Sequence, residues 1–178
     1  MNTLTFRSPE ELRTHNLLSV VAHPDDLEMH HSAALSFANQ SFALIATDGE
    51  KTKLNFTNQV FESPEQIAQV RRVESIRSLA QLGITATVYG ELPDGQLGNE
   101  PNFSALIDII RETVEKHDIT AILTLGEHGY CGHPDHQATH SAAVAARDAL
   151  LGEGVSLPLL ALSHDHLGEL RIPVDRTR

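Results

Sequence analysis

Two short clusters of histidine and aspartate stand out in this chain, about a hundred residues apart. The first is Ala22–Asp26 (AHPDD) and the second is His133–His136 (HPDH). Each cluster follows an apolar run that is typical of a buried strand. Imidazoles and carboxylates are the usual ligands of catalytic zinc, which binds three side chains and keeps a further position for water. The two clusters therefore indicate a metal-dependent hydrolytic site.

The residue types suggest how the roles are divided between the clusters. His23 and Asp26 are candidate ligands three positions apart, and either His133 or His136 completes the set. A bound metal lowers the pKa of its water to roughly 7, so the adjacent carboxylate of Asp25 can act as general base. A histidine that does not bind the metal can stabilise the oxyanion. Two histidines with one carboxylate suit zinc, and they also accept Fe(II) or another divalent metal.

The other histidines and the cysteine have plainer interpretations. His136 and His140 have the spacing of the HExxH zinc motif, but Gln137 stands where that motif requires glutamate. We therefore expect His140 to be structural. A thiol without a CxxC partner is expected to be inert, which applies to Cys131. Four further histidines are expected to be structural or on the surface: His30, His31, His164 and His166.

Apolar and polar runs alternate along the chain and predict strands and helices in turn. The clearest helix begins at Pro64, with Ser63 as its N-cap, Gln66 three residues after the cap and Gly83 at its end. The polar stretch 51–62 is expected to be a loop. Strands are expected at 17–22, 41–47, 85–89, 121–125 and 157–162, and helices at 27–39, 64–82, 103–117 and 135–150.

This alternation predicts an α/β fold: a Rossmann-like, open and mainly parallel sheet with helices on both faces, in a three-layer sandwich. A common strand order for such sheets is 3-2-1-4-5, in which the first and fourth strands are neighbours. Ligands bind outside the carboxyl ends of the strands, where the strand order reverses. The two clusters follow the first and fourth strands, so we expect them to meet in one crevice.

Composition narrows the class of protein. We expect one domain, 1–178, because the chain shows no linker, repeat or low-complexity tract. The net charge of −11 disfavours nucleic acid and membrane surfaces as partners. The single cysteine excludes an intramolecular disulfide, and no signal peptide or apolar run of ~20 residues is apparent, so a cytoplasmic location is expected. A homo-oligomer is compatible with these features.

Together with three further motifs, the clusters resemble a known family. The chain is similar to the LmbE-like, or PIG-L-type, zinc-dependent N-acetylglucosaminyl de-N-acetylases, which include the deacetylases of mycothiol and bacillithiol synthesis. The resemblance runs from about Leu17 to Ala146. The five motifs are AHPDD at 22–26, TDGE at 47–50, R-x-x-E followed by LG at 71–83, PDG at 93–95 and HG-x-x-GHPDH at 128–136.

The resemblance implies a role for each matching residue. The side chains that it implies as zinc ligands are His23, Asp26 and His136. It implies Asp25 as the general base and His133 as the group that polarises the amide carbonyl, with Asp135 orienting His133. The residues that it places against the sugar substrate are Glu50, Arg71 and Asp94.

Two features depart from the family pattern. The glycine-rich helix start that usually follows the first cluster is replaced by Met29–Ala33 (MHHSA), so we expect different packing beside the metal. The chain after Leu162 is short for the family, which leaves the identity of the substrate open.

These expectations combine into a metal-dependent hydrolase that removes acetyl from an N-acetylated amino sugar or its conjugate. One alternative is an amidase that acts on a larger amide conjugate. Another is a module that holds a metal and a small molecule without turnover, although such a module has no use for Asp25. A dinucleotide-binding domain is disfavoured, because the first strand leads into His-Pro-Asp-Asp rather than G-x-G-x-x-G.

Overall fold

The computed structural model describes residues 2–5, 9–52, 60–164, 170–171 and 173–176. These residues form an α/β fold around one open sheet, as the sequence predicts. Its parallel strands are β2 (Asn16–Val21), β3 (Gln40–Thr47), β4 (Ala86–Leu92), β5 (Ala121–Leu125) and β6 (Leu159–His164).

The order of the parallel strands is β4-β3-β2-β5-β6. In chain order this is 3-2-1-4-5, so the predicted topology is confirmed. Ser19 of β2 lies opposite Ala43 of β3 on one side and opposite Leu123 of β5 on the other. The strands that precede the two clusters are therefore hydrogen-bonded neighbours, and their carboxyl ends emerge at the same edge of the sheet.

Three short antiparallel strands, which the sequence analysis did not predict, extend the sheet beyond β6. β8 (Pro173–Arg176) pairs with β6 and with β1 (Asn2–Thr5), and β7 (Leu170–Arg171) also pairs with β6. Elements of two to four residues are too short to show the alternation of side chains that identifies a strand. They lie at the sheet edge opposite β4.

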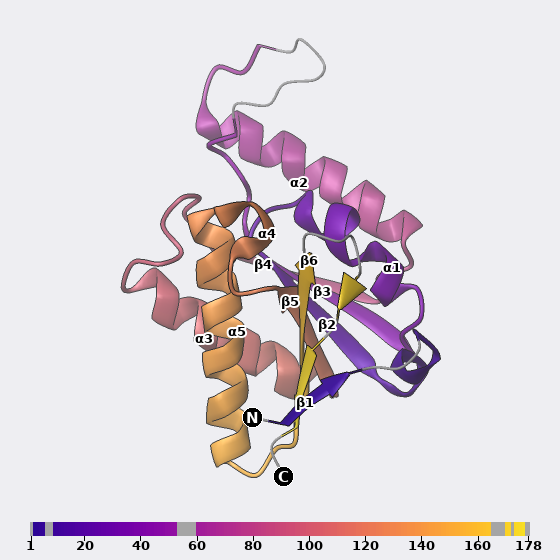
Figure 1. Cartoon of the computed structure of the whole chain (residues 1–178). Coiled ribbons are helices and arrows are strands. Elements are labelled where there is room, and N and C mark those ends of the chain that lie inside the picture. Colours follow the sequence, from indigo (N-terminus) through magenta and orange to yellow (C-terminus); the bar gives the residue numbers. More distant parts are fainter. Residues whose placement is uncertain (1, 6–8, 53–59, 165–169, 172, 177–178) are drawn as a thin grey trace.

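Helices cover both faces of the sheet, which confirms the three-layer arrangement (Figure 1). On one face, α3 (Asn102–Lys116) and α5 (Pro134–Gly152) pack against a core that includes Leu18 and Val20 of β2. Leu17 of β2 points into the core on the opposite face. The elements on that opposite face are η1 (Pro9–Thr14), η2 (Leu27–His31), α1 (Ser32–Leu35) and α2 (Pro64–Gln81).

The helix α2 begins as its sequence signals predict. Ser63 is the N-cap, and its hydroxyl accepts a hydrogen bond from the backbone N–H of Gln66 at 3.3 Å. Only Ser75 and Leu79 of the helix are buried, whereas Val73 and Ile76 are 47% and 53% exposed. The helix therefore rests on the sheet along one narrow stripe. None of the helices in the described residues is long and apolar enough to cross a bilayer.

The segment after the first cluster differs from the predicted helix at 27–39. It forms a π-helical turn, η2, followed by the short α1, which ends at Leu35. A π turn places one extra residue in the helical ladder and is common at functional sites. Here the turn directs His31 into the core, where its Nδ1 lies 2.7 Å from the hydroxyl of Ser19. His31 thus contacts β2 from within the π turn.

A second local difference lies before the second cluster. The segment expected to be a loop contains a short helical turn, α4 (Gly129–Gly132), in which Tyr130 has a φ of 61°. Of the polar stretch predicted to be a loop, residues 53–59 lie outside the described residues, and so do His166 and the side chain of His164. Nδ1 of His140 donates to the carbonyl of Leu125 at 2.8 Å, which fits the structural role expected for this histidine.

His31 makes the fold sensitive to acid. It is fully buried, and its Nε2 has no hydrogen-bond partner among the described residues. Burial, with a smaller effect of His30, lowers the pKa of His31 to about 3. The unfolded chain binds a proton at His31 below a pH of about 6.5, whereas the folded chain does not. This histidine therefore costs the fold stability as the pH falls from 6.5 towards 3.

We predict that His31→Gln reduces the loss of stability at low pH. Glutamine keeps a polar partner for Ser19 and does not titrate. Between pH 7 and pH 5, the His31 contribution to the loss of unfolding free energy is about 2 kcal/mol, from the linkage relation. Urea unfolding at both pH values measures the difference. His128→Gln, at a side chain that is 89% exposed, is the matched control and should behave as the wild type. An equal loss in wild type and His31→Gln would contradict the prediction.

Candidate metal centre

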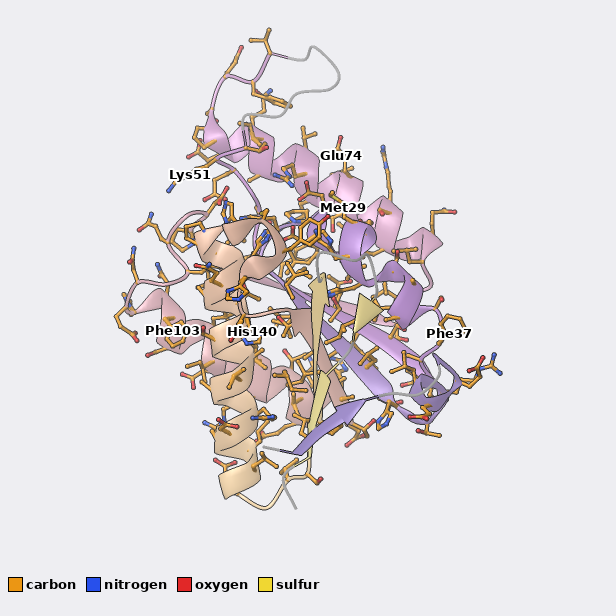
Figure 2. All side chains as sticks on the ribbon, in the orientation of Figure 1. Met29, Phe37, Lys51, Glu74, Phe103 and His140 are labelled. Atoms are coloured by element: carbon orange, nitrogen blue, oxygen red, sulfur yellow. The ribbon has the colours of Figure 1, made fainter. Side chains whose placement is uncertain are left out.

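The candidate site lies at the carboxyl ends of four neighbouring strands. The first cluster follows β2, the TDGE motif ends β3, Asp94 follows β4, and the second cluster follows β5. Met29 and Lys51, in the segments that follow β2 and β3, both lie in the upper half of the view in Figure 2. The strand order thus brings together residues that are far apart in sequence, as the sequence predicts for such a sheet.

The three side chains predicted as metal ligands face one another. Nδ1 of His23 lies 3.3 Å from Oδ2 of Asp26 and 3.2 Å from Nε2 of His136. Oδ1 of Asp26 lies 3.2 Å from Nε2 of His136. In a tetrahedral zinc site with bonds of ~2.0–2.1 Å, ligand atoms are separated by about 3.3 Å. The donor types suit zinc, and each histidine faces a different oxygen of Asp26 at a separation close to that of zinc ligands. A ring nitrogen of His133 also lies within 4.8 Å of ring nitrogens of His23 and His136.

A hydrogen bond to the backbone determines which ring nitrogen of His136 is free to bind a metal. Nδ1 of His136 lies 3.0 Å from the carbonyl oxygen of Gly129, so that nitrogen carries the proton and donates. Nε2 is then left with its lone pair towards His23 and Asp26. Gly129 has a φ of 62°, and a Cβ there would lie 2.8 Å from Cβ of His136. Glycine is required here by both backbone conformation and space.

The predicted catalytic residues Asp25 and His133 border this triad. The ring of His133 lies 4.9 Å from that of His23 and 4.8 Å from that of His136, centroid to centroid. Asp25 is exposed, and its carboxylate forms an ion pair with Arg71. The carboxylate of Asp25 thus pairs with Arg71, whereas that of its neighbour Asp26 faces His23 and His136.

The carboxylates of Asp94 and Asp135 both face His23, a contact that the sequence did not predict. Oδ1 of Asp94 lies 3.3 Å from Nε2 of His23, and Oδ2 of Asp135 lies 3.5 Å from the same nitrogen. Both carboxylates are buried. Asp135 meets His133 through its backbone N–H, which donates to Nδ1 of His133 at 3.2 Å. The carboxylate that was expected to orient His133 therefore faces His23.

Glu50 and Arg71, the other two residues predicted to contact the substrate, connect the loops around the three ligands. Oε1 of Glu50 accepts a hydrogen bond from the backbone N–H of Asp94 at 2.9 Å. Nη1 of Arg71 donates to the carbonyl of Gly49 at 3.0 Å, so Arg71 joins the β3 loop to Asp25. These contacts hold the loops after β2, β3 and β4 in one arrangement.

Sequence reasoning missed a second arginine beside the site. Arg72 donates to the carboxylate of Asp48 at 2.9–3.0 Å and to Glu91 at 2.8 Å. Its guanidinium also lies over the ring of Tyr89, 4.6 Å from the centroid. The acidic TDGE motif, which contains Asp48, was the available sequence signal for a partner.

The electrostatics of the site favour a positive charge. Burial opposes protonation of His23, but hydrogen bonds with Asp135, Asp26 and Asp94 outweigh it and raise the pKa of His23 to about 11. Burial also opposes protonation of His136, but the effect of Asp26 is larger and raises the pKa of His136. Burial, and then the charges of His23 and His136, lower the pKa of His133. The carboxylates thus create a negative potential that a divalent cation would also experience.

A comparison with known families identifies the chain's relatives. Residues 18–147 match the GlcNAc-PI de-N-acetylase (PIG-L) family. The chain belongs to this family. The sequence-based resemblance to it is therefore confirmed, and the matched segment includes every residue predicted for the site.

Individual relatives are more distant. A 1D-myo-inositol 2-acetamido-2-deoxy-alpha-D-glucopyranoside deacetylase of Mycobacterium leprae is 29% identical over 167 residues, covering 78% of this chain and 53% of that protein. The chain thus spans about half the length of the curated relatives it matches.

Solved structures establish the fold. N,N'-diacetylchitobiose deacetylase from Pyrococcus horikoshii has a TM-score of 0.63 at 18% identity, with 82% of this chain and 60% of that chain covered. GalB, the 4-carboxy-2-hydroxymuconate hydratase from Pseudomonas putida, has a TM-score of 0.70 at 14% identity, with 84% and 65% covered. Because one is a deacetylase and the other a hydratase, the fold alone does not specify the reaction.

We predict that Gly129→Ala weakens zinc binding by at least ~10-fold, because it displaces His136 and the carbonyl that orients it. The matched control is Gly132→Ala. Gly132 also has a positive φ, 78°, but a Cβ there meets nothing within 4 Å. Both variants carry a backbone cost of about 1–2 kcal/mol, and only Gly129→Ala should change zinc affinity. Competition with a chromophoric chelator measures it; equal affinities in the two variants would contradict the prediction.

Proposed function

We propose that the protein is a zinc-dependent hydrolase that removes acetyl from an N-acetylated amino sugar or its conjugate. The observation that carries this proposal is the convergence of His23, Asp26 and His136 at 3.2–3.3 Å, with the ring of His133 beside them. Asp25 is the neighbour of Asp26 in the chain. Membership of a de-N-acetylase family supports the reaction class. The relatives named as deacetylases of acetamido sugars support the substrate class.

The proposed chemistry assigns a separate task to each side chain. A zinc ion held by His23, Asp26 and His136 would supply a Lewis acid that acidifies water and polarises the acetyl carbonyl. Asp25 holds the attacking water and accepts its proton. His133 donates a hydrogen bond to the carbonyl oxygen as negative charge develops there. Asp25 or His133 then delivers a proton to the departing nitrogen, which releases acetate and the free amine.

Glu50 and Arg71 are proposed to position the sugar. Glu50 and Arg71 join the loops that surround the triad. Arg71 also contacts Asp25, so a sugar hydroxyl bound by Arg71 would lie next to the general base. The sugar contact that the sequence predicts for Asp94 is not part of this proposal, because Asp94 is buried and its carboxylate faces Nε2 of His23.

Two alternatives within this site differ in substrate or in turnover. An amidase for larger conjugates would use the same residues, and a module without turnover would use only the ligands. An amine-release screen that compares free N-acetylglucosamine with bulky acetamido conjugates separates the three. Zinc is proposed as the metal; loading with Fe(II) in parallel tests the other divalent ion that this ligand set accepts.

We predict that Asp25→Asn and His136→Ala fail in different ways. Asp25→Asn should bind zinc as the wild type does and lose ~10²–10⁴-fold in kcat, because only the base is removed. His136→Ala should lose most of its zinc, because one of three ligands is missing. Zinc content by elemental analysis and amine release by a fluorogenic reagent are measured on the same samples.

The control for removal of a surface carboxylate is Asp108→Asn on α3, which should match the wild type in both measurements. Unchanged turnover in Asp25→Asn would exclude it as the base. Full zinc occupancy in His136→Ala would exclude the proposed ligand set.

A further inference from the structure

Asp94 and Asp135 share one partner, the second nitrogen of His23. Nδ1 of His23 faces Asp26 and His136, whereas Nε2 faces the two carboxylates at 3.3 and 3.5 Å. The imidazole therefore lies between a group of ligand atoms and a pair of buried acids. Nε2 faces only groups that accept, so it carries a proton. A cation bound between Nδ1, Asp26 and His136 would take the place of a proton on Nδ1, and it requires the lone pair of that nitrogen to be free.

Backbone donors hold both carboxylates in place. Oδ2 of Asp94 accepts from the N–H of Lys51 at 2.8 Å. Asp135 accepts from the N–H of Gly95 at 2.6 Å and from that of Leu97 at 3.2 Å. These three peptide groups offset the repulsion between two acids that lie against one imidazole. The loops therefore orient two acids that do not face the ligand side of His23.

We propose that Asp94 and Asp135 are positioning residues that fix the tautomer and orientation of His23 for metal binding. This inference rests on the proposed metal site, and it gives both aspartates a role other than the one expected from the sequence. A carboxylate behind a ligating histidine increases the basicity of the ligating nitrogen and restricts the ring. Loss of such a partner typically weakens metal binding by 10–100-fold.

The substitution Asp94→Asn tests the role with almost no change in shape. The carboxylate accepts on both oxygens, from Lys51 and from His23, but an amide can accept on only one side. The introduced amide must either oppose the Lys51 N–H with its own NH₂ group or present that NH₂ group to Nε2 of His23. The first outcome removes the contact that holds residue 94 in place, and the second removes the acceptor from Nε2. Either one weakens the support for the tautomer that leaves Nδ1 free.

The experiment measures zinc affinity by chelator competition for the wild type, Asp94→Asn and Asp135→Asn. We expect 10–100-fold weaker zinc binding in each variant. With zinc at saturation, we expect KM for the acetamido substrate within about twofold of the wild type, since a positioning residue behind His23 does not touch the sugar. Asp48→Asn is the matched control, because Asp48 is a partly buried acid near the site that pairs with Arg72 instead. Its zinc affinity should equal that of the wild type.

A double-mutant cycle distinguishes action through His23 from a general effect on the loops. In a His23→Ala background, Asp94→Asn should cause no further loss of zinc affinity, because its partner is gone. A loss of the same size in both backgrounds would overturn the proposal. Wild-type zinc affinity in Asp94→Asn together with a raised KM would also overturn it, because Asp94 would then be a sugar ligand. Wild-type zinc affinity in Asp135→Asn together with a lowered kcat would overturn it as well. A wild-type protein that binds no zinc would instead overturn the proposed function itself.

Discussion

The structure depends on the adjacency of two parallel strands, β2 and β5. Their hydrogen-bonded register places the residues that follow each strand at one edge of the sheet. Donor atoms from His23 and His136, separated by 113 positions in the chain, consequently lie 3.2 Å apart. No local signal in either cluster could produce this contact, because each cluster supplies only part of a ligand set. The strand order is therefore the constraint on which the whole site rests.

A concentration of buried charge is the cost of this arrangement, and the fold offsets it with hydrogen bonds. Asp26, Asp94 and Asp135 are all buried around His23. Unpaired, each would be strongly unfavourable. Peptide N–H groups from the loops after β2, β3 and β4 donate hydrogen bonds to these carboxylates. The loops that surround the site therefore also fix the positions of its acids. A site with such a surplus of negative charge is stable only if it holds protons or a cation, which connects its electrostatics to its proposed use.

The parallel strands and most helices could be predicted from the sequence, because their signals are local. Apolar runs and helix caps located the parallel strands and the helices α2, α3 and α5 to within about three residues, and the strand order is the common one assumed for such an alternation. The π turn at His31 could not be predicted, since it depends on a tertiary contact with Ser19. The contacts of Asp94 and Asp135 with His23 were missed for the same reason: spacing shows which residues share an edge, but not which way a carboxylate turns.

The match of this fold to both a deacetylase and a hydratase means that the reaction must be argued from the site rather than from the sheet. The most direct test of the account is a crystal structure of the protein loaded with one equivalent of zinc, with anomalous data collected on both sides of the zinc absorption edge. The account predicts one anomalous peak, bonded to His23, Asp26 and His136. A peak at any other place, or no peak after stoichiometric loading, would contradict it.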